Sequence, residues 1–146
     1  MSDAAFHLRA TTAADADAIA RLLAQLDHPT PAAEVPARLA AVQAEGGAAV
    51  VAVDAAGQPV GLITLAKHAV LHAPGPVALI TALVTAADAR RGGAGRALVA
   101  EARRWAAREG CVRLSVTSAE RRADAHAFYA ACGLPYTGRR FSAAIP

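Results

Sequence analysis

The hydrophobic and polar positions at the start of the chain predict a strand followed by a helix. Residues 6–10 alternate apolar and polar side chains, which is the pattern of a half-buried strand. Residues 12–26 then carry apolar side chains at helical spacing. Thr12 and Asp15 have the spacing of a capping box, with Asp in place of the usual Glu, so we place the start of this helix at Thr12.

A second helix and a β-hairpin follow. Apolar positions on one helical face predict a helix over residues 33–45, and Gly46 with Gly47 ends it. Residues 48–53 and 60–66 are apolar and rich in β-branched side chains. The turn-forming residues between these two segments predict that they pair as a hairpin.

The second half of the chain alternates strands and helices. We predict a central strand over residues 77–85, which are apolar on both faces, a helix over 96–109, a strand over 112–117, a helix over 123–132 and a last strand over 136–141. The order of the elements predicts a single α/β domain over residues 1–146. Its sheet is mixed and its helices cover both faces.

The composition fits this fold and narrows the choice of partners. Hydrophobic residues make up 55% of the 146 positions but aromatic residues only 4%, so the core is built mainly from Leu, Val, Ile and Ala. The net charge of +3 comes from arginines that are spread along the chain rather than gathered in a basic run. This distribution argues against nucleic acid as the main partner.

Cysteine spacing and hydropathy exclude several further classes. Cys111 and Cys132 form no CxxC pair and no histidine cluster accompanies them, so we expect no metal site and expect both thiols to be reduced and buried. The acidic residues within positions 1–20 argue against a secretory signal. The weakly charged stretch 69–87 is broken by two prolines and is no membrane helix, so we expect a cytoplasmic protein without a membrane partner.

The loop Arg90–Arg96 lies between the predicted strand 77–85 and the helix that follows it, and it contains three glycines. A glycine-rich turn at a helix N-terminus binds phosphate, because backbone N–H groups and the positive end of the helix dipole point at the ligand. A Walker loop is excluded, because Gly95-Arg96-Ala97 lacks the Lys-Ser/Thr ending. A dinucleotide fold is also disfavoured, because the loop does not follow the first strand of the chain.

Two motifs carry a resemblance to a known family. Arg90-x-x-Gly93-x-Gly95 resembles the acetyl-coenzyme A (acetyl-CoA) signature of the GNAT (Gcn5-related N-acetyltransferase) superfamily. The block from Ala125 to Leu134, which contains Phe128-Tyr129 and Gly133, is similar to the family's C-terminal helix motif. The resemblance implies a central mixed, largely antiparallel sheet flanked by about four helices and splayed between its fourth and fifth strands.

The resemblance also implies roles for individual residues. It places the coenzyme pyrophosphate on the loop and first helical turn, at Arg90, Arg91, Gly92, Gly93, Ala94, Gly95 and Arg96. It lays the pantetheine along Leu83, Val84 and Thr85, with the Leu83 N–H polarising the thioester carbonyl. Tyr129 matches the family's general acid, and an ordinary phenol, with a pKa of about 10, is protonated at neutral pH. Arg122 lies close to where relatives place an asparagine that contacts the coenzyme, and is a candidate contact to its phosphates.

The base and the acceptor stay open. Many relatives carry a glutamate on the fourth strand, where this chain has Leu79 and Thr81, and neither can accept a proton. His72, His126 and Asp54 are the remaining candidates for the base. Asp27, His28 and His72 are candidate contacts for the acceptor, because they stand in loops flanking the predicted site.

Three functions remain to be separated. The resemblance implies an enzyme that transfers the acetyl group of acetyl-CoA to a primary amine by direct attack in a ternary complex, without a metal and with a small molecule or peptide as acceptor. The missing glutamate leaves open an acyl-CoA-binding sensor or regulatory module of the same fold. A nicotinamide-dependent enzyme is the third, and relatives make a homodimer a further expectation.

Overall fold

Five strands form one mixed sheet in the computed structural model, which describes residues 6–89, 92–117, 123–138 and 140–146. The strands are β1 (Phe6–Ala10), β2 (Ala48–Asp54), β3 (Pro59–His68), β4 (Val77–Thr85) and β5 (Arg113–Val116), and they follow one another across the sheet in this order. Each of the first four pairs antiparallel with its neighbour, whereas β5 pairs parallel with β4. The predicted mixed sheet and the hairpin of β2 with β3 are confirmed.

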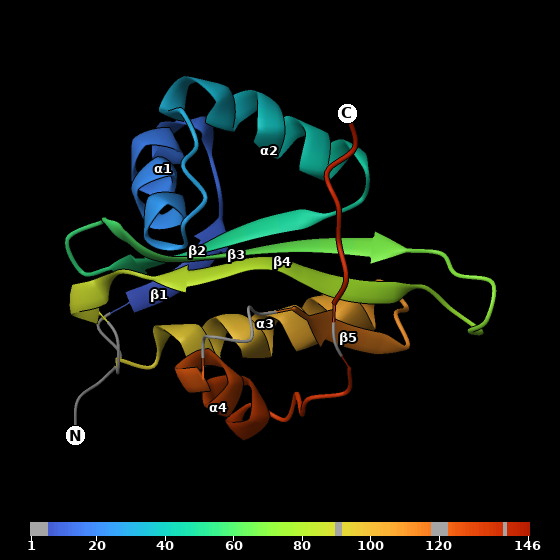
Figure 1. Cartoon of the computed structure of the whole chain (residues 1–146). Coiled ribbons are helices and arrows are strands. Elements are labelled where there is room, and N and C mark those ends of the chain that lie inside the picture. Colours follow the sequence, from blue (N-terminus) through green and yellow to red (C-terminus); the bar gives the residue numbers. More distant parts are fainter. Residues whose placement is uncertain (1–5, 90–91, 118–122, 139) are drawn as a thin grey trace.

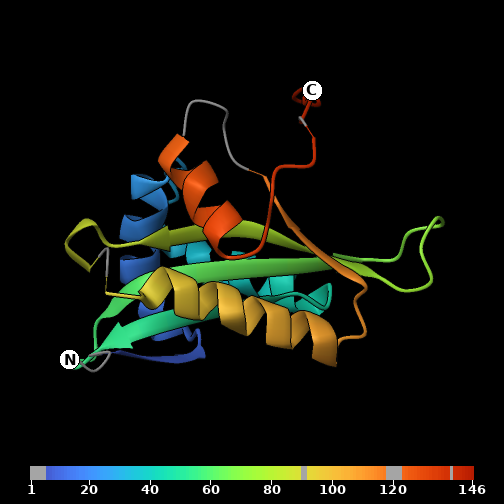
Figure 2. The same ribbon diagram turned by 90° about the horizontal axis from the view of Figure 1, so that it is seen from below.

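Helices cover both faces of this sheet. Figure 1 shows α1 (Ala16–Gln25) and α2 (Val35–Ala44) on one face and α3 (Ala94–Arg108) and α4 (Ala123–Ala131) on the other, and Figure 2 shows the second pair from below. Each face therefore has its own core. The core under α3 contains Ile63, Ile80 and Leu98, and the core under α1 contains Ile19, Leu22 and Leu62.

The first helix begins with the predicted capping box. The Thr12 backbone N–H donates to Asp15 Oδ2 at 2.8 Å, and a short 3₁₀ turn over Ala13–Asp15 leads into α1. Arg9 on β1 donates to both Asp15 carboxylate oxygens at 2.9 Å, which lowers the pKa of that nearly buried carboxyl group below its usual value. Thus the start of α1 is tied to the first strand.

The last strand of the prediction is wrong. Residues 136–138 and 140–141 form no strand, and the Tyr136 and Phe141 side chains are 71% and 89% exposed. Residues five apart face opposite sides of a strand, so these two rings cannot make one apolar face. The polar and glycine positions between them, Thr137, Gly138 and Arg140, supply no other.

Two further predictions from the sequence concern the cysteines and membrane helices. Cys111 and Cys132 are free thiols, but each is half-buried rather than buried. None of the described helices is long and apolar enough to cross a membrane.

Strand β4 is paired with β5 over only part of its length. The parallel pairing runs from Val77 to Ile80, while β4 continues to Thr85. Between these parts the register with β3 shifts, so that Thr81 is an extra residue in β4, as in a β-bulge. Among the described residues, the last part of β4 is therefore paired only with β3, and its other edge borders a cavity.

Candidate functional site

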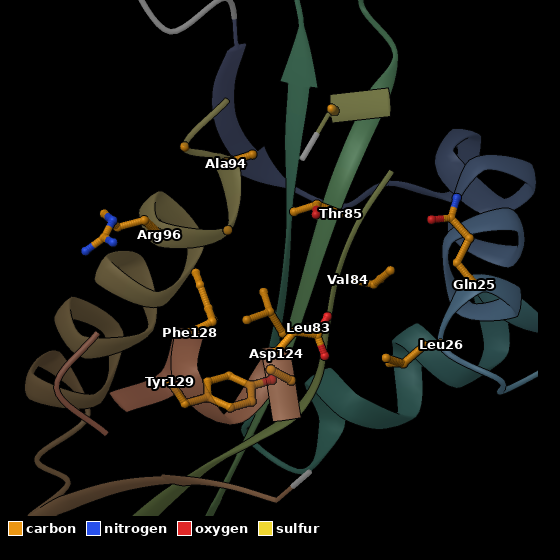
Figure 3. A pocket seen from close by; sticks show the side chains of 14 residues that line it. Gln25, Leu26, Leu83, Val84, Thr85, Ala94, Arg96, Asp124, Phe128 and Tyr129 are labelled. Carbon is orange, nitrogen blue, oxygen red and sulfur yellow. The ribbon is translucent and has the colours of Figure 1, made fainter. Parts of the chain in front are cut away.

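A cavity of about 450 Å³ opens beside the unpaired edge of β4. Its lining comes from distant parts of the sequence (Figure 3): Gln25, Leu26, Leu83, Val84, Thr85, Ala89, Gly93, Ala94, Gly95, Arg96, Asp124, Ala125, Phe128 and Tyr129. These residues belong to the end of α1, the end of β4, the start of α3 and one face of α4. The volume lies within the usual range of small-molecule sites.

The start of α3 supplies hydrogen-bond donors to this cavity. Gly93 is the N-cap and has a left-handed backbone, with φ of 89°. The first intrahelical bond runs from the Ala97 N–H to the Gly93 carbonyl at 3.0 Å. The N–H groups of Ala94, Gly95 and Arg96 therefore have no acceptor within the helix, and they lie at its positive end. This arrangement suits an anion, with the exposed Arg96 side chain beside it.

The two glycines of this turn have different reasons to be glycine. A Cβ at Gly93 would meet no atom within 4 Å, so the constraint there is the positive φ. A Cβ at Gly95 would lie 3.3 Å from Phe128 Cζ and 3.7 Å from Thr85 Cγ2. Gly95 thus allows α3, α4 and the end of β4 to approach each other, while the space over Gly93 is open.

The edge of β4 directs peptide groups toward the same cavity. The Ala86 N–H donates to the Val60 carbonyl at 2.7 Å, and hydrogen-bonded pairs alternate along an antiparallel ladder. Leu83 and Thr85 are thereby non-hydrogen-bonded positions, with N–H and C=O groups that point away from β3. The Leu83 side chain packs on the core under α3, but Val84 packs on the core under α1. The cavity consequently passes around the edge of the sheet.

Helix α4 contributes side chains rather than backbone. Asp124, Ala125, Phe128 and Tyr129 lie at helical spacings that place them on one face of α4. The rings of Phe128 and Tyr129 meet edge to face with centroids 5.5 Å apart. Arg103 of α3 donates to the Cys132 carbonyl at 2.7 Å, which holds the C-terminal end of α4 against α3.

The end of α1 has a fixed backbone. The Asp27 N–H donates to the Ala24 carbonyl at 3.1 Å and the His28 N–H to the Leu23 carbonyl at 3.0 Å, as in a Schellman motif. Asp27 takes the left-handed position of that motif, with φ of 64°, where glycine is usual. This turn fixes the part of α1 that lines the cavity.

The structure brings most of the predicted site residues together. Leu83, Val84, Thr85, Gly93, Ala94, Gly95, Arg96 and Tyr129 line the cavity. Gly92 adjoins them in the chain, and Arg90, Arg91 and Arg122 lie outside the described residues. Asp27 and His28 directly follow the lining residues of α1 but are not among them. His72 lies in the loop before β4, at the end of that strand remote from the cavity.

Six lining residues were not among the predicted site residues: Gln25, Leu26, Ala89, Asp124, Ala125 and Phe128. Gln25 and Leu26 reach the cavity only because α1 packs across the sheet beside β4. No local sequence pattern predicts this packing. Asp124 had a signal, since it stands one turn before Phe128 on the helix of Tyr129.

The candidate bases do not gather in the cavity. Leu79 and Thr81 do not line it, and Thr81 Oγ1 lies 2.5 Å from Thr64 Oγ1. Asp54 caps the β2–β3 turn, where its Oδ1 accepts from the Ala56 and Gln58 N–H groups at 2.9 Å each. His126 is half-buried on α4 but is not a lining residue. Within the described ranges, no three His, Cys, Asp or Glu residues are grouped to hold a metal ion.

Comparison with known proteins gives one family. The model of the acetyltransferase (GNAT) family matches residues 16–134. No curated protein sequence matches the chain.

Solved structures give the same fold. An acetyltransferase from Trypanosoma brucei has a TM-score of 0.84 at 21% identity, over 96% of this chain and 99% of its own. A transcriptional regulator from Bacillus halodurans has a TM-score of 0.85 at 23% identity, with the same two coverages. A candidate acetyltransferase from Agrobacterium tumefaciens has a TM-score of 0.83 at 28% identity, over 95% of this chain and 99% of its own.

Proposed function

Because this chain belongs to the GNAT acetyltransferase family, we propose that it transfers the acetyl group of acetyl-CoA to a primary amine by direct attack in a ternary complex. The observation that carries the proposal is the cavity between the start of α3, the open edge of β4 and Tyr129. It brings together the N–H groups at a helix N-terminus, the edge of β4 and a tyrosine side chain.

The donor side of the cavity fits acetyl-CoA. The N–H groups of Ala94, Gly95 and Arg96 would hold its diphosphate, and the open space over Gly93 admits it. The peptide groups of Leu83 and Thr85, which point away from β3, would hold its extended pantetheine arm as an added strand is held. When bound, acetyl-CoA supplies a thioester that an amine can cleave.

Two groups of this chain would then act at the thioester. The Leu83 N–H donates to the carbonyl oxygen and stabilises the negative charge that develops on it. The Tyr129 hydroxyl gives its proton to the departing sulfur. Both residues line the cavity, from β4 and α4 respectively.

A sensor that binds acyl-CoA without turnover is the second candidate. Leu79 and Thr81 favour it, because neither supplies the carboxylate that many relatives carry on this strand. The retained Tyr129 favours the enzyme. A cytoplasmic location and a homodimer stay predictions from the sequence.

One experiment separates these functions. Acetyl-CoA is titrated into the protein by calorimetry, and a pool of primary amines is then added while released thiol is measured. We expect binding with a dissociation constant in the range of about 1 μM to 1 mM that is usual for enzyme substrates, followed by thiol release that depends on an amine. Binding without release would identify the sensor, and absence of binding would contradict both.

A further inference from the structure

The end of the cavity at α1 and α4 has its own charge. Among the described residues that line the cavity, Asp124 is the only acidic one, and Arg96 is the only basic one. Arg96 stands at the start of α3, whereas Asp124 stands in the first turn of α4. The cavity therefore has a positive side chain where the donor's phosphates would bind and a negative one at the start of α4.

Asp124 and Tyr129 are spaced so that a reacting group can be bound between their side chains. The two residues are five positions apart on α4, which corresponds to about 7.5 Å along the helix axis. In Figure 3 the Asp124 side chain lies between Tyr129 on one side and Gln25 and Leu26 of α1 on the other. A group bound by Asp124 would thus lie between the general acid and the end of α1.

Helix α1 favours the same sign of ligand. Gln25 is its last residue and Leu26 its C-cap, so the negative end of the α1 dipole adjoins the cavity. Leu26 and Val84 add apolar walls next to this end. A cation with an apolar body matches these surfaces.

We propose that Asp124 binds the acceptor as an ammonium ion and receives its proton, so that the acceptors are primary amines that are cationic at neutral pH. The inference rests on the proposed acetyl transfer. It assigns to α4 the carboxylate that is missing at Leu79 and Thr81 of β4.

The proton and electron count closes with this assignment. The ammonium group gives one proton to the Asp124 carboxylate, and the nitrogen lone pair forms the C–N bond to the acetyl carbon. The C–S bond breaks with its electron pair on sulfur, and the sulfur takes the Tyr129 hydroxyl proton. The second nitrogen proton returns to the Tyr129 oxygen, and Asp124 releases its proton to solvent. The net products are an amide, a free thiol and one proton.

Asp124 also has an ordinary structural use, which the test must separate. A carboxylate in the first turn stabilises a helix through the helix dipole. Asp17 stands in the first turn of α1, is exposed like Asp124, and does not line the cavity. Asp17→Asn is therefore the matched control.

The experiment compares acceptors that differ in charge. The wild type, Asp124→Asn, Asp124→Glu and Asp17→Asn proteins are given acetyl-CoA with a panel of alkylamines and benzylamines, which are cationic at neutral pH, and of ring-substituted anilines, which are neutral. Products are quantified by mass spectrometry. Acetyl-CoA affinity and urea unfolding are measured for each variant.

We expect the wild type to acetylate the cationic amines. Asp124→Asn should lower kcat/KM for them about 100-fold, the lower end of the effect of a general base, with less than about a 3-fold change for any aniline that is acetylated. Asp124→Glu should recover part of the loss, and Asp17→Asn should match the wild type. Acetyl-CoA affinity should be the same in all four proteins.

Three results would overturn the inference. They are equal losses for cationic and neutral amines in Asp124→Asn, no loss in that variant, and a wild type that acetylates anilines but no cationic amine. A wild type that acetylates neither class of amine, or that does not bind acetyl-CoA, would instead contradict the proposed function itself.

Discussion

Helices α3 and α4 lie on the same face of the sheet and border the same cavity, but they are held in different ways. In α3 a row of residues is buried: Ala94, Leu98, Val99, Ala102, Trp105 and Ala106. In α4 none of the side chains at positions 124–131 is buried. Its C-terminal end is held by the Arg103 hydrogen bond to the Cys132 carbonyl and by Leu134, which packs on the core under α3.

The difference matches what each helix contributes. Helix α3 offers backbone N–H groups, and backbone donors act on charge only if they are fixed beforehand. Helix α4 offers the side chains of Asp124 and Tyr129, which can adjust to the acceptor. We infer that the α3 end of the cavity, where acetyl-CoA would bind, is rigid. The α4 end, where the acceptor would bind, tolerates movement.

The largest expected effect tests the difference in packing. Leu98 on α3 is 0% exposed, so Leu98→Ala should lower the free energy of unfolding by about 3 kcal/mol, because it leaves a cavity in the core. Leu134→Ala removes the same atoms from a half-buried position after α4 and should cost about half as much. Urea unfolding measures both, and equal losses would refute the contrast between the two helices.

The second prediction separates chemistry from binding on α4. Tyr129→Phe should lower turnover about 100-fold by removing the proton donor. The acetyl-CoA affinity should stay within experimental error of the wild type, because the ring keeps its contact with Phe128. Steady-state kinetics and calorimetry check this, and unchanged turnover would remove Tyr129 from the mechanism.

The third prediction concerns the two glycines at the start of α3. Gly93→Ala should destabilise the protein by about 1–2 kcal/mol, because alanine is strained at φ of 89°. Gly95→Ala introduces no such strain, but its Cβ would lie 3.3 Å from Phe128 Cζ, so the Phe128 ring must shift. Because Phe128 lines the cavity, this shift should weaken acetyl-CoA binding about 10-fold, or about 1.4 kcal/mol.

Unfolding curves and calorimetry on both variants measure these two effects. The different roles assigned to the two glycines are contradicted if Gly95→Ala binds acetyl-CoA as tightly as the wild type, or if Gly93→Ala is as stable as the wild type.

These residues also show how far the sequence could predict the molecule. The glycine-rich turn before α3, the capping box at Thr12 and the strand over residues 77–85 depend on local chemistry, and all were predicted from it, although α3 begins at Ala94 rather than at Arg96. The strand predicted over 136–141 failed, because its side chains give no single apolar face and because a strand also needs a partner strand, which is not a local property.

The candidate site divides in the same way. Its donor side follows from a continuous motif around Gly93. Gln25 and Leu26 are brought to it by packing between α1 and β4, and Asp124 could be recognised only once the cavity showed which face of α4 lines it.

The smallest expected effect compares the thiols that follow the two helices. Burial raises the pKa of the Cys111 thiol, so a smaller fraction is the reactive thiolate at neutral pH. Cys132 follows the less packed helix. We expect iodoacetamide to alkylate Cys132 several-fold faster than Cys111, as followed by peptide mass spectrometry. Faster alkylation of Cys111 would mean that the end of α3, not of α4, is the looser one.

Hydrogen–deuterium exchange with and without acetyl-CoA tests the central claim most directly. The account predicts that acetyl-CoA slows exchange in the peptides that contain the N–H groups of Leu83, Thr85 and Ala94–Arg96, because these groups become hydrogen-bond donors to the bound molecule. Binding of acetyl-CoA that leaves exchange at these positions unchanged, and slows it elsewhere, would contradict it.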